Sequence, residues 1–112
     1  MFMKTSLVFA ALLFAVPAAA QDINDAQIAS IVVTANQVDI DAGKLAASKA
    51  SNADVRKFGD RMVVDHTGVN KAAVELATRL GVTPEDNATS RALKTPGDKN
   101  LATDNGLSDA AF

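Results

Sequence analysis

Apolar residues recur in alternating steps of three and four through most of the region between Asn24 and Leu80. This spacing places side chains along one side of an α-helix, where they form a seam for packing. The first series predicts a helix over 24–50, whose opposite side is polar. The members of this first seam are Ile28, Ile31, Ala35, Val38, Ala42 and Leu45.

A second helix is predicted from the hinge at Ser51-Asn52 to about Leu80. Ser and Asn are preferred at the N-cap position of a helix, and Gly81 stands where a C-cap glycine is expected. Two helices joined by so short a hinge form an antiparallel hairpin, which we assign to residues 21–81. The second seam consists of Val55, Phe58, Met62, Asp65, Val69, Ala72 and Leu76.

The periodic pattern ends after the hairpin. Pro96 and Gly97 disfavour a helix interior, so residues 82–106 are expected to form a long irregular connection, with at most a helical turn around 89–93. Residues 107–112 resemble the start of a further helix. We therefore assign 82–112 to an irregular crossover segment followed by the beginning of a third helix.

Residues 1–20 have the order of a secretory signal peptide. Lys4 precedes an apolar run over 7–16, and Ala18-Ala19-Ala20 provides small residues for cleavage after Ala20. The apolar run is about half the ~20 residues that a spanning helix needs, so no transmembrane anchor is expected in the mature chain. The predicted location is periplasmic or secreted. The chain has no cysteine and hence no disulfide framework.

Composition argues against several classes of function. The chain has 11 basic and 13 acidic residues with no basic cluster, so nucleic-acid binding is not expected. A single His without a nucleophile motif argues against a hydrolytic triad. Gly43, Gly59 and Gly68 lie inside the predicted helices, where they indicate close helix approach rather than a phosphate-binding loop. No enzymatic activity is predicted.

Asp39, Asp65 and His66 are the candidate site. Asp39 lies about 12 residues before the hinge and Asp65 about 13 after it, so both stand at nearly the same height in an antiparallel hairpin. Carboxylates and a histidine on facing helices are the ligands of metal-binding bundles, and suit Fe, Mn or Zn. The alternative is structural: Asp65 pairs with Arg61, and His66 is hydrogen-bonded by Asp39 or Gln37.

The sequence resembles the ferritin-like domain-of-unknown-function family 4142, whose members are described as outer-membrane or periplasmic proteins. The resemblance implies an exported four-helix bundle with a long crossover between its second and third helices. It also implies two further helices after the segment at 107–112, so the chain matches the front half of such a bundle, truncated at its C-terminus. The family commonly has Glu at the position of Asp39. The residues that show the resemblance are Gly43–Ala46, Lys49–Asn52, Val55, Phe58-Gly59 and Met62–His66.

The sequence thus predicts an all-α protein, an exported helical hairpin that forms half of a ferritin-like four-helix bundle with a polar irregular tail. The expected role is structural or interactive, with the seams covered by a second copy in a homo-oligomer or by missing C-terminal helices. The alternative role is metal binding by Asp39, Asp65 and His66. A third hypothesis is that the polar segment 82–106 binds a partner.

Overall fold

The computed structural model describes residues 22–107, and its regular elements there are three α-helices. They are α1 (Asp25–Lys49), α2 (Ala53–Arg79) and α3 (Ala88–Asn105). The all-α fold predicted from the sequence is confirmed. The predicted signal peptide at 1–20 and most of the predicted helix start at 107–112 lie outside the described residues.

Side chains that satisfy free backbone groups fix the ends of α1 and α2. The Asn24 side chain accepts a hydrogen bond from the Gln27 backbone, and the Gln27 side chain accepts one from the Asn24 backbone, which forms a capping box. The Asn52 side chain caps α2 by accepting from the backbone of Asp54 and Val55. At the other end of α2, Gly81 adopts φ +66°, a left-handed conformation that favours glycine.

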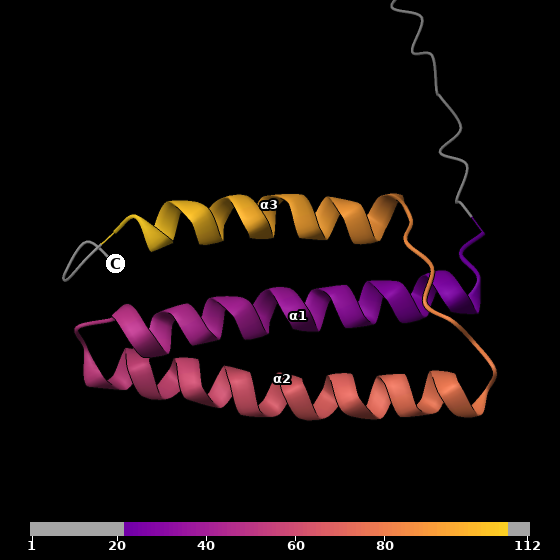
Figure 1. The fold of residues 1–112 in the computed structure, drawn as a ribbon, viewed down its shortest axis with the longest axis horizontal. Helices are drawn as coiled ribbons and strands as arrows, with labels where there is room; N and C mark the ends of the chain where they lie inside the picture. The colour runs from indigo at the N-terminus through magenta and orange to yellow at the C-terminus, as the bar shows by residue number, and fades with distance from the viewer. Residues whose placement is uncertain (1–21, 108–112) are drawn as a thin grey trace, which may run out of the picture.

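Helices α1 and α2 form an antiparallel hairpin, as predicted (Figure 1). Contacts along the hairpin define its register. Gly43 lies against Gly59 near the hinge, Asp39 contacts His66 in the middle, and Asn70 donates to the backbone oxygen of Val33 further along. The residue number falls along α1 as it rises along α2, so residues whose numbers add to a nearly constant value stand at the same height.

The prediction of an irregular segment over 82–106 is wrong, because 18 of these residues form α3. The Asn87 side chain caps this helix by accepting from the backbone of Thr89 and Ser90, and the Ser90 hydroxyl completes a capping box. Pro96 lies inside the helix and leaves one backbone hydrogen bond unmade. Capping and packing against α1 outweigh this local cost.

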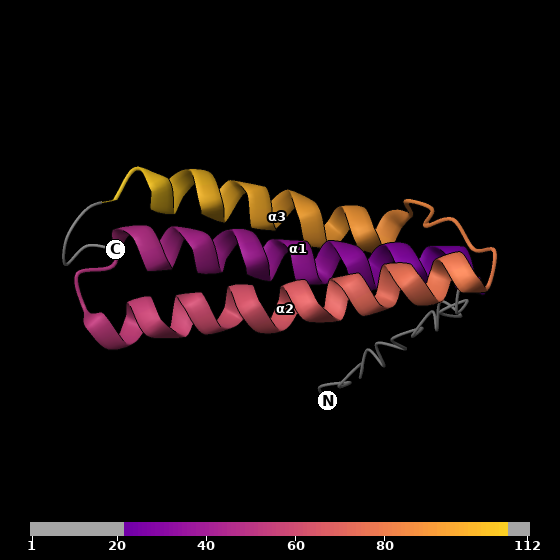
Figure 2. The same ribbon diagram turned by 60° about the horizontal axis from the view of Figure 1, so that its bottom comes forward.

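Helix α3 runs parallel to α1, and both of its ends are joined to that helix. At the first end, the Ser30 hydroxyl donates to Asp86 and the Asn87 side-chain amide donates to the backbone oxygen of Gln27. At the other end, the Lys49 ammonium donates to the backbone oxygens of Asn105 and Leu107. The connection after α2 is therefore confined to residues 80–87, without the long crossover that the family resemblance implies (Figure 2).

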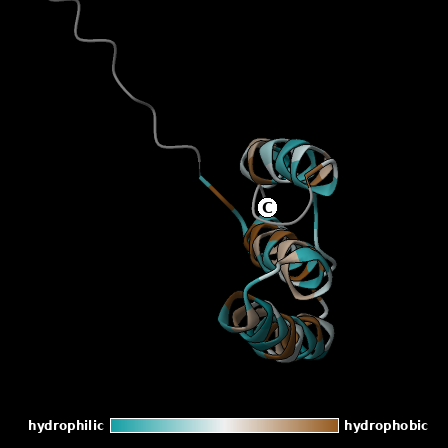
Figure 3. Ribbon diagram, turned by 90° about the vertical axis from the view of Figure 1, so that its left-hand side faces the viewer, coloured by the Kyte–Doolittle hydropathy of each residue, from teal (hydrophilic) through white to brown (hydrophobic). Residues whose placement is uncertain are grey.

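The three helices form a single layer with α1 in the middle. Viewed from the end, α3 and α2 lie on opposite sides of α1 (Figure 3). Gly97 of α3 allows close approach to Val38, since a Cβ at position 97 would lie 2.9 Å from both Val38 methyl groups. Within the described residues, this single layer of helices leaves both of its broad faces uncovered. Between residues 22 and 107, every helix falls short of the apolar length needed to cross a bilayer.

Candidate functional site

His66 occupies the side of α2 that faces α1. The least exposed positions of α2 recur in steps of three and four, which is the spacing of one helix face. These positions are Arg56, Gly59, Val63, His66, Asn70, Ala73 and Ala77. The predicted second seam lies one residue away from this series, and apart from Met62 its members are exposed. The predicted second seam is therefore rotated by about 100° from the side of α2 that packs on α1.

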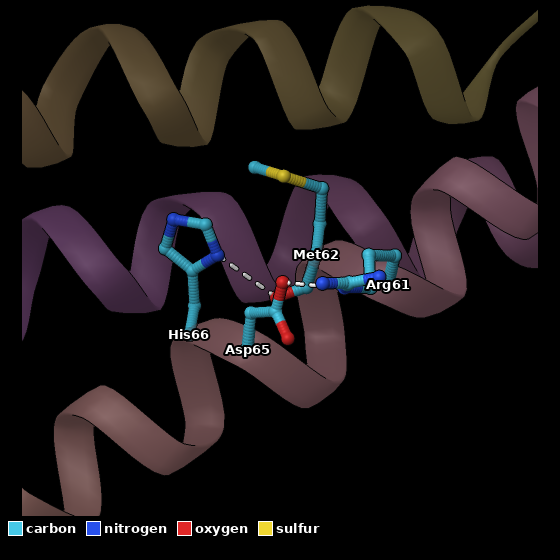
Figure 4. Close-up of polar contacts among 4 residues, drawn as sticks. All are labelled: Arg61, Met62, Asp65 and His66. Carbon is cyan, nitrogen blue, oxygen red and sulfur yellow. Dashed lines mark hydrogen bonds and ion pairs between the residues drawn. The ribbon is translucent and has the colours of Figure 1, made fainter.

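Asp39 and His66 form the central contact of the hairpin. His66 Nε2 lies 3.1 Å from Asp39 Oδ2, and His66 Nδ1 lies 2.9 Å from the backbone oxygen of Met62 (Figure 4 shows the second contact). The His66 side chain is 25% exposed and that of Asp39 is 46% exposed. The predicted pairing of Asp39 with His66 is confirmed as a close contact, while Gln37 instead donates to Asp41 on its own helix.

A neutral His66 ring carries one proton, and both of its contacts are with oxygen atoms that can accept that proton in a hydrogen bond. A backbone oxygen only accepts, so Nδ1 must carry a proton to bond Met62. In that neutral tautomer, Nε2 has no proton and directs its lone pair at the Asp39 carboxylate. The arrangement becomes attractive on both sides if His66 carries both protons, or if a cation lies between Nε2 and the carboxylate.

Asp65 is not part of this contact. Its carboxylate accepts a hydrogen bond from Arg61 Nε at 2.7 Å, and its side chain is 52% exposed (Figure 4). The spacing of four residues on one helix makes this a surface pair, as the structural alternative predicted. The structure thus brings together two of the three candidate residues, while the third is exposed between the apolar positions Met62 and Val69 of α2.

The described part of the chain supplies too few ligands for a metal site of its own. Among residues 22–107, no group of three or more His, Cys, Asp or Glu side chains is arranged to hold an ion. Protein metal sites of the catalytic type use at least three protein ligands. Asp39 and His66 provide two, so an Fe, Mn or Zn ion at this position would need further ligands from outside the described chain.

An apolar groove opens on the same side of the hairpin as the Asp39–His66 contact. It has a volume of about 270 Å³ and is lined mainly by apolar residues of α1 and α2, including Ile28, Val32, Leu76 and Leu80. The groove is one end of a longer surface, because α2 continues it with apolar side chains at helical spacing. We call this surface the open stripe; it consists of Ile28, Val32, Val55, Phe58, Met62, Val69, Leu76 and Leu80.

The open stripe contains large apolar side chains that are exposed to solvent. Phe58 is 64% exposed, Leu80 is 66% exposed, and Val69 is 51% exposed. Six members of the stripe belong to the two seams predicted from the sequence. Their spacing therefore identifies a true apolar side of the hairpin, but in this structure that side is uncovered. Val32 and Leu80 were absent from the predicted seams, although each lies four residues from a seam member.

The family model described as domain of unknown function, DUF4142, matches residues 13–112. The chain belongs to the DUF4142 family. The resemblance seen in the sequence is therefore confirmed. No curated protein and no solved structure matches the chain. Membership of DUF4142 assigns no biochemical activity, so the functional argument for this DUF4142 chain rests on its own residues.

Proposed function

We propose that this DUF4142 chain is an exported helical protein that acts by binding another protein surface through the open stripe. Its role is structural or interactive rather than catalytic. The observation that supports this proposal most directly is the exposure of the stripe, on which seven large apolar side chains are 36–66% exposed. Soluble monomers rarely keep a contiguous apolar surface of this kind without a partner.

Export is the second part of the proposal. The basic residue, apolar run and small residues at 1–20 support secretion with cleavage after Ala20, which places the mature chain in the periplasm or outside the cell. The mature protein then begins at Gln21, next to the described helices. An intact mass of the protein recovered from cells tests this directly. A chain that retains residues 1–20 would contradict export with cleavage.

A ferritin-like arrangement follows if two further helices cover the open stripe. In such bundles, four helices direct their seams toward a common interior. The α1–α2 hairpin supplies two helices of this kind, and the stripe is the side that would face the others. The added helices can come from a second copy, from the C-terminal helices that the family resemblance implies, or from a separate protein.

Position-specific photo-crosslinking tests the interaction proposal. A photoreactive amino acid at Val69, on the stripe, is compared with the same group at Val64, which is 68% exposed but lies off the stripe. We expect a discrete covalent adduct from position 69 in living cells and none from position 64. Absence of an adduct at position 69, or equal adducts at both positions, would contradict the proposal.

Metal binding is the second candidate function, and the geometry of His66 favours it. The Met62 backbone oxygen holds the proton on Nδ1, which leaves Nε2 free as a ligand, as in many metal sites. The Asp39 carboxylate lies beside that nitrogen. The remaining ligands would come from an associated chain. We expect Zn(II), Fe(II) or Mn(II) to raise the melting temperature, and His66→Ala to abolish the rise. An unchanged melting temperature with all three ions rejects this candidate.

A further inference from the structure

We propose that the open stripe is covered by a second copy of this chain, related by a two-fold axis parallel to the helices. In this dimer, α1 of each copy packs against α2 of the other, and four helices enclose the two stripes. The inference rests on the proposed function and deepens it, because it names both the partner and its orientation.

The register of the hairpin determines what meets across such an interface. Asp39 and His66 stand at the same height, and Ile28 and Leu76 line the same groove. Rotation about an axis parallel to the helices leaves every height unchanged. Each α1 residue of the stripe therefore meets the α2 residue of the second copy that stands at the same height. Apolar side chains thus pack against apolar side chains. Because α1 and α2 are antiparallel, all neighbouring helices of the resulting four are antiparallel as well.

The polar groups within the apolar surface favour a second copy over a wholly apolar partner. Asp39, Asp65 and His66 interrupt the apolar surface in the middle of the hairpin, and a carboxylate covered by apolar side chains alone would be costly. In the proposed dimer, Asp39 instead meets the partner's His66. The two Asp39 carboxylates and the two His66 imidazoles then alternate around one level of the interface, while each Asp65 stays paired with Arg61. Each Asp39 therefore has imidazoles as its neighbours, and a proton on each His66 Nε2 makes these contacts attractive.

The position of Asp39 also selects the orientation of the two-fold axis. A two-fold axis perpendicular to the helices would place α1 on α1 and α2 on α2. With the axis at mid-height, Asp39 would then face the partner's Asp39, and two like charges would be opposed in an apolar interface. The parallel axis avoids this opposition. Helix α3 does not obstruct it, because α3 lies on the side of α1 away from α2 (Figure 3).

Site-directed crosslinking tests the orientation, and the absence of native cysteine makes single-cysteine variants clean probes. Full-length Ile28→Cys and Leu76→Cys chains are purified separately, mixed, and treated with a short bismaleimide. We expect a two-chain product that joins position 28 of one copy to position 76 of the other. Val64→Cys, mixed with Ile28→Cys, is the matched control and should give no such product.

Oligomeric state provides the second measurement. Native mass spectrometry and light scattering of the unmodified chain should show a dimer whose fraction rises with concentration. We expect Val69→Asp to weaken dimerisation about tenfold or more, because it places a charge in the interface, and Val64→Asp to leave it unchanged. Circular dichroism of both variants shows whether the helices are retained. The crosslinks do not depend on these charged variants, so the proposal stays testable if Val69→Asp unfolds.

Three outcomes overturn the inference in distinguishable ways. A monomer at every concentration excludes the second copy. A dimer linked mainly through two copies of position 28, or through position 64, excludes the orientation. An adduct from position 69 in cells that contains a different protein rejects self-association while retaining the proposed interaction function. No adduct and no dimer together reject both.

Discussion

Gly43 and Gly59 face each other where α1 crosses α2, close enough that neither position has room for a side chain. A Cβ on Gly43 would lie 2.8 Å from the Gly59 backbone oxygen, and a Cβ on Gly59 would lie 2.6 Å from the Gly43 oxygen. Backbone atoms cannot move aside as a flexible side chain can. The hinge end of the hairpin is therefore held at a separation that only glycine permits.

Alanine at either crossing glycine should loosen the hairpin. We expect Gly43→Ala and Gly59→Ala each to lower the free energy of unfolding by about 1–3 kcal/mol, because the added methyl group forces the helices apart. Gly68→Ala is the matched control, since a Cβ there meets no atom within 4 Å. It should raise stability by about 0.5–1 kcal/mol through helix propensity. Urea unfolding followed by circular dichroism measures all three, and destabilisation by Gly68→Ala would contradict the argument.

Removal of the His66 ring tests the central contact. His66→Ala loses the contact with Asp39 and the bond to the Met62 backbone. Because Asp39 is nearly half exposed and solvent screens the pair, we expect a loss of only about 1 kcal/mol. Asp65→Ala removes a neighbouring surface pair and should change stability by less than about 0.5 kcal/mol. If the two substitutions lower the free energy of unfolding equally in urea, the central contact stabilises the fold no more than the surface pair does.

The cap of α3 should determine whether this helix stays folded. Asn87→Ala removes two hydrogen bonds to the start of α3 and one to the Gln27 backbone, so we expect a loss of about 1–2 kcal/mol. Hydrogen exchange should show the loss mainly in α3 amides. Asn100→Ala, at an exposed position within the same helix, should leave their protection unchanged or increased. Uniform loss of protection across all three helices would contradict a local role for the cap.

Disruption of the Lys94–Asp98 pair should change the pKa of Lys94 rather than the packing of α3. The hydrogen bond and charge of Asp98 raise the pKa of Lys94 above its ordinary value. A raised lysine pKa stabilises the fold at all pH values below the ordinary value, and this contribution is lost as the pH rises through the folded-state pKa. Asp98→Asn should therefore lower the pKa of Lys94, as measured by NMR, whereas Asp60→Asn on α2 should leave it unchanged. The stability difference between wild type and Asp98→Asn should disappear in the alkaline range.

The hairpin could be predicted from the sequence because its signals are local and agree with one another. The caps, the glycine at position 81 and the apolar periodicity all mark the same boundaries. The partnership of Asp39 with His66 also followed from counting residues on either side of the hinge, since an antiparallel register converts equal spacing into equal height. The Arg61–Asp65 pair followed from the i, i+4 spacing on one helix.

Two features of the structure could not be predicted from such local signals: the side of α2 that contacts α1, and helix α3. Apolar spacing shows which side of a helix is hydrophobic, but it does not show whether that side meets the adjacent helix or a shared interior. The candidate site therefore placed Asp65 between α1 and α2, although the seam that contains Asp65 lies about 100° of helix rotation away from that side. Helix α3 was missed because Pro96 and Gly97 disfavour helix locally, and the local N-cap signal at Asn87 was given no weight against them. The fit of Gly97 against Val38 depends on tertiary structure.

The central position of α1 also governs how the molecule comes apart. Both neighbours depend on α1, but the interface with α2 is the larger of the two, and α3 is a shorter helix interrupted by proline. Thermal fluctuations should therefore release α3 first, as a separate low-energy opening that leaves the hairpin intact. A protease would then find its earliest cleavage sites in the last helix. The chain would thus lose its structure from one side inward, rather than in a single cooperative step.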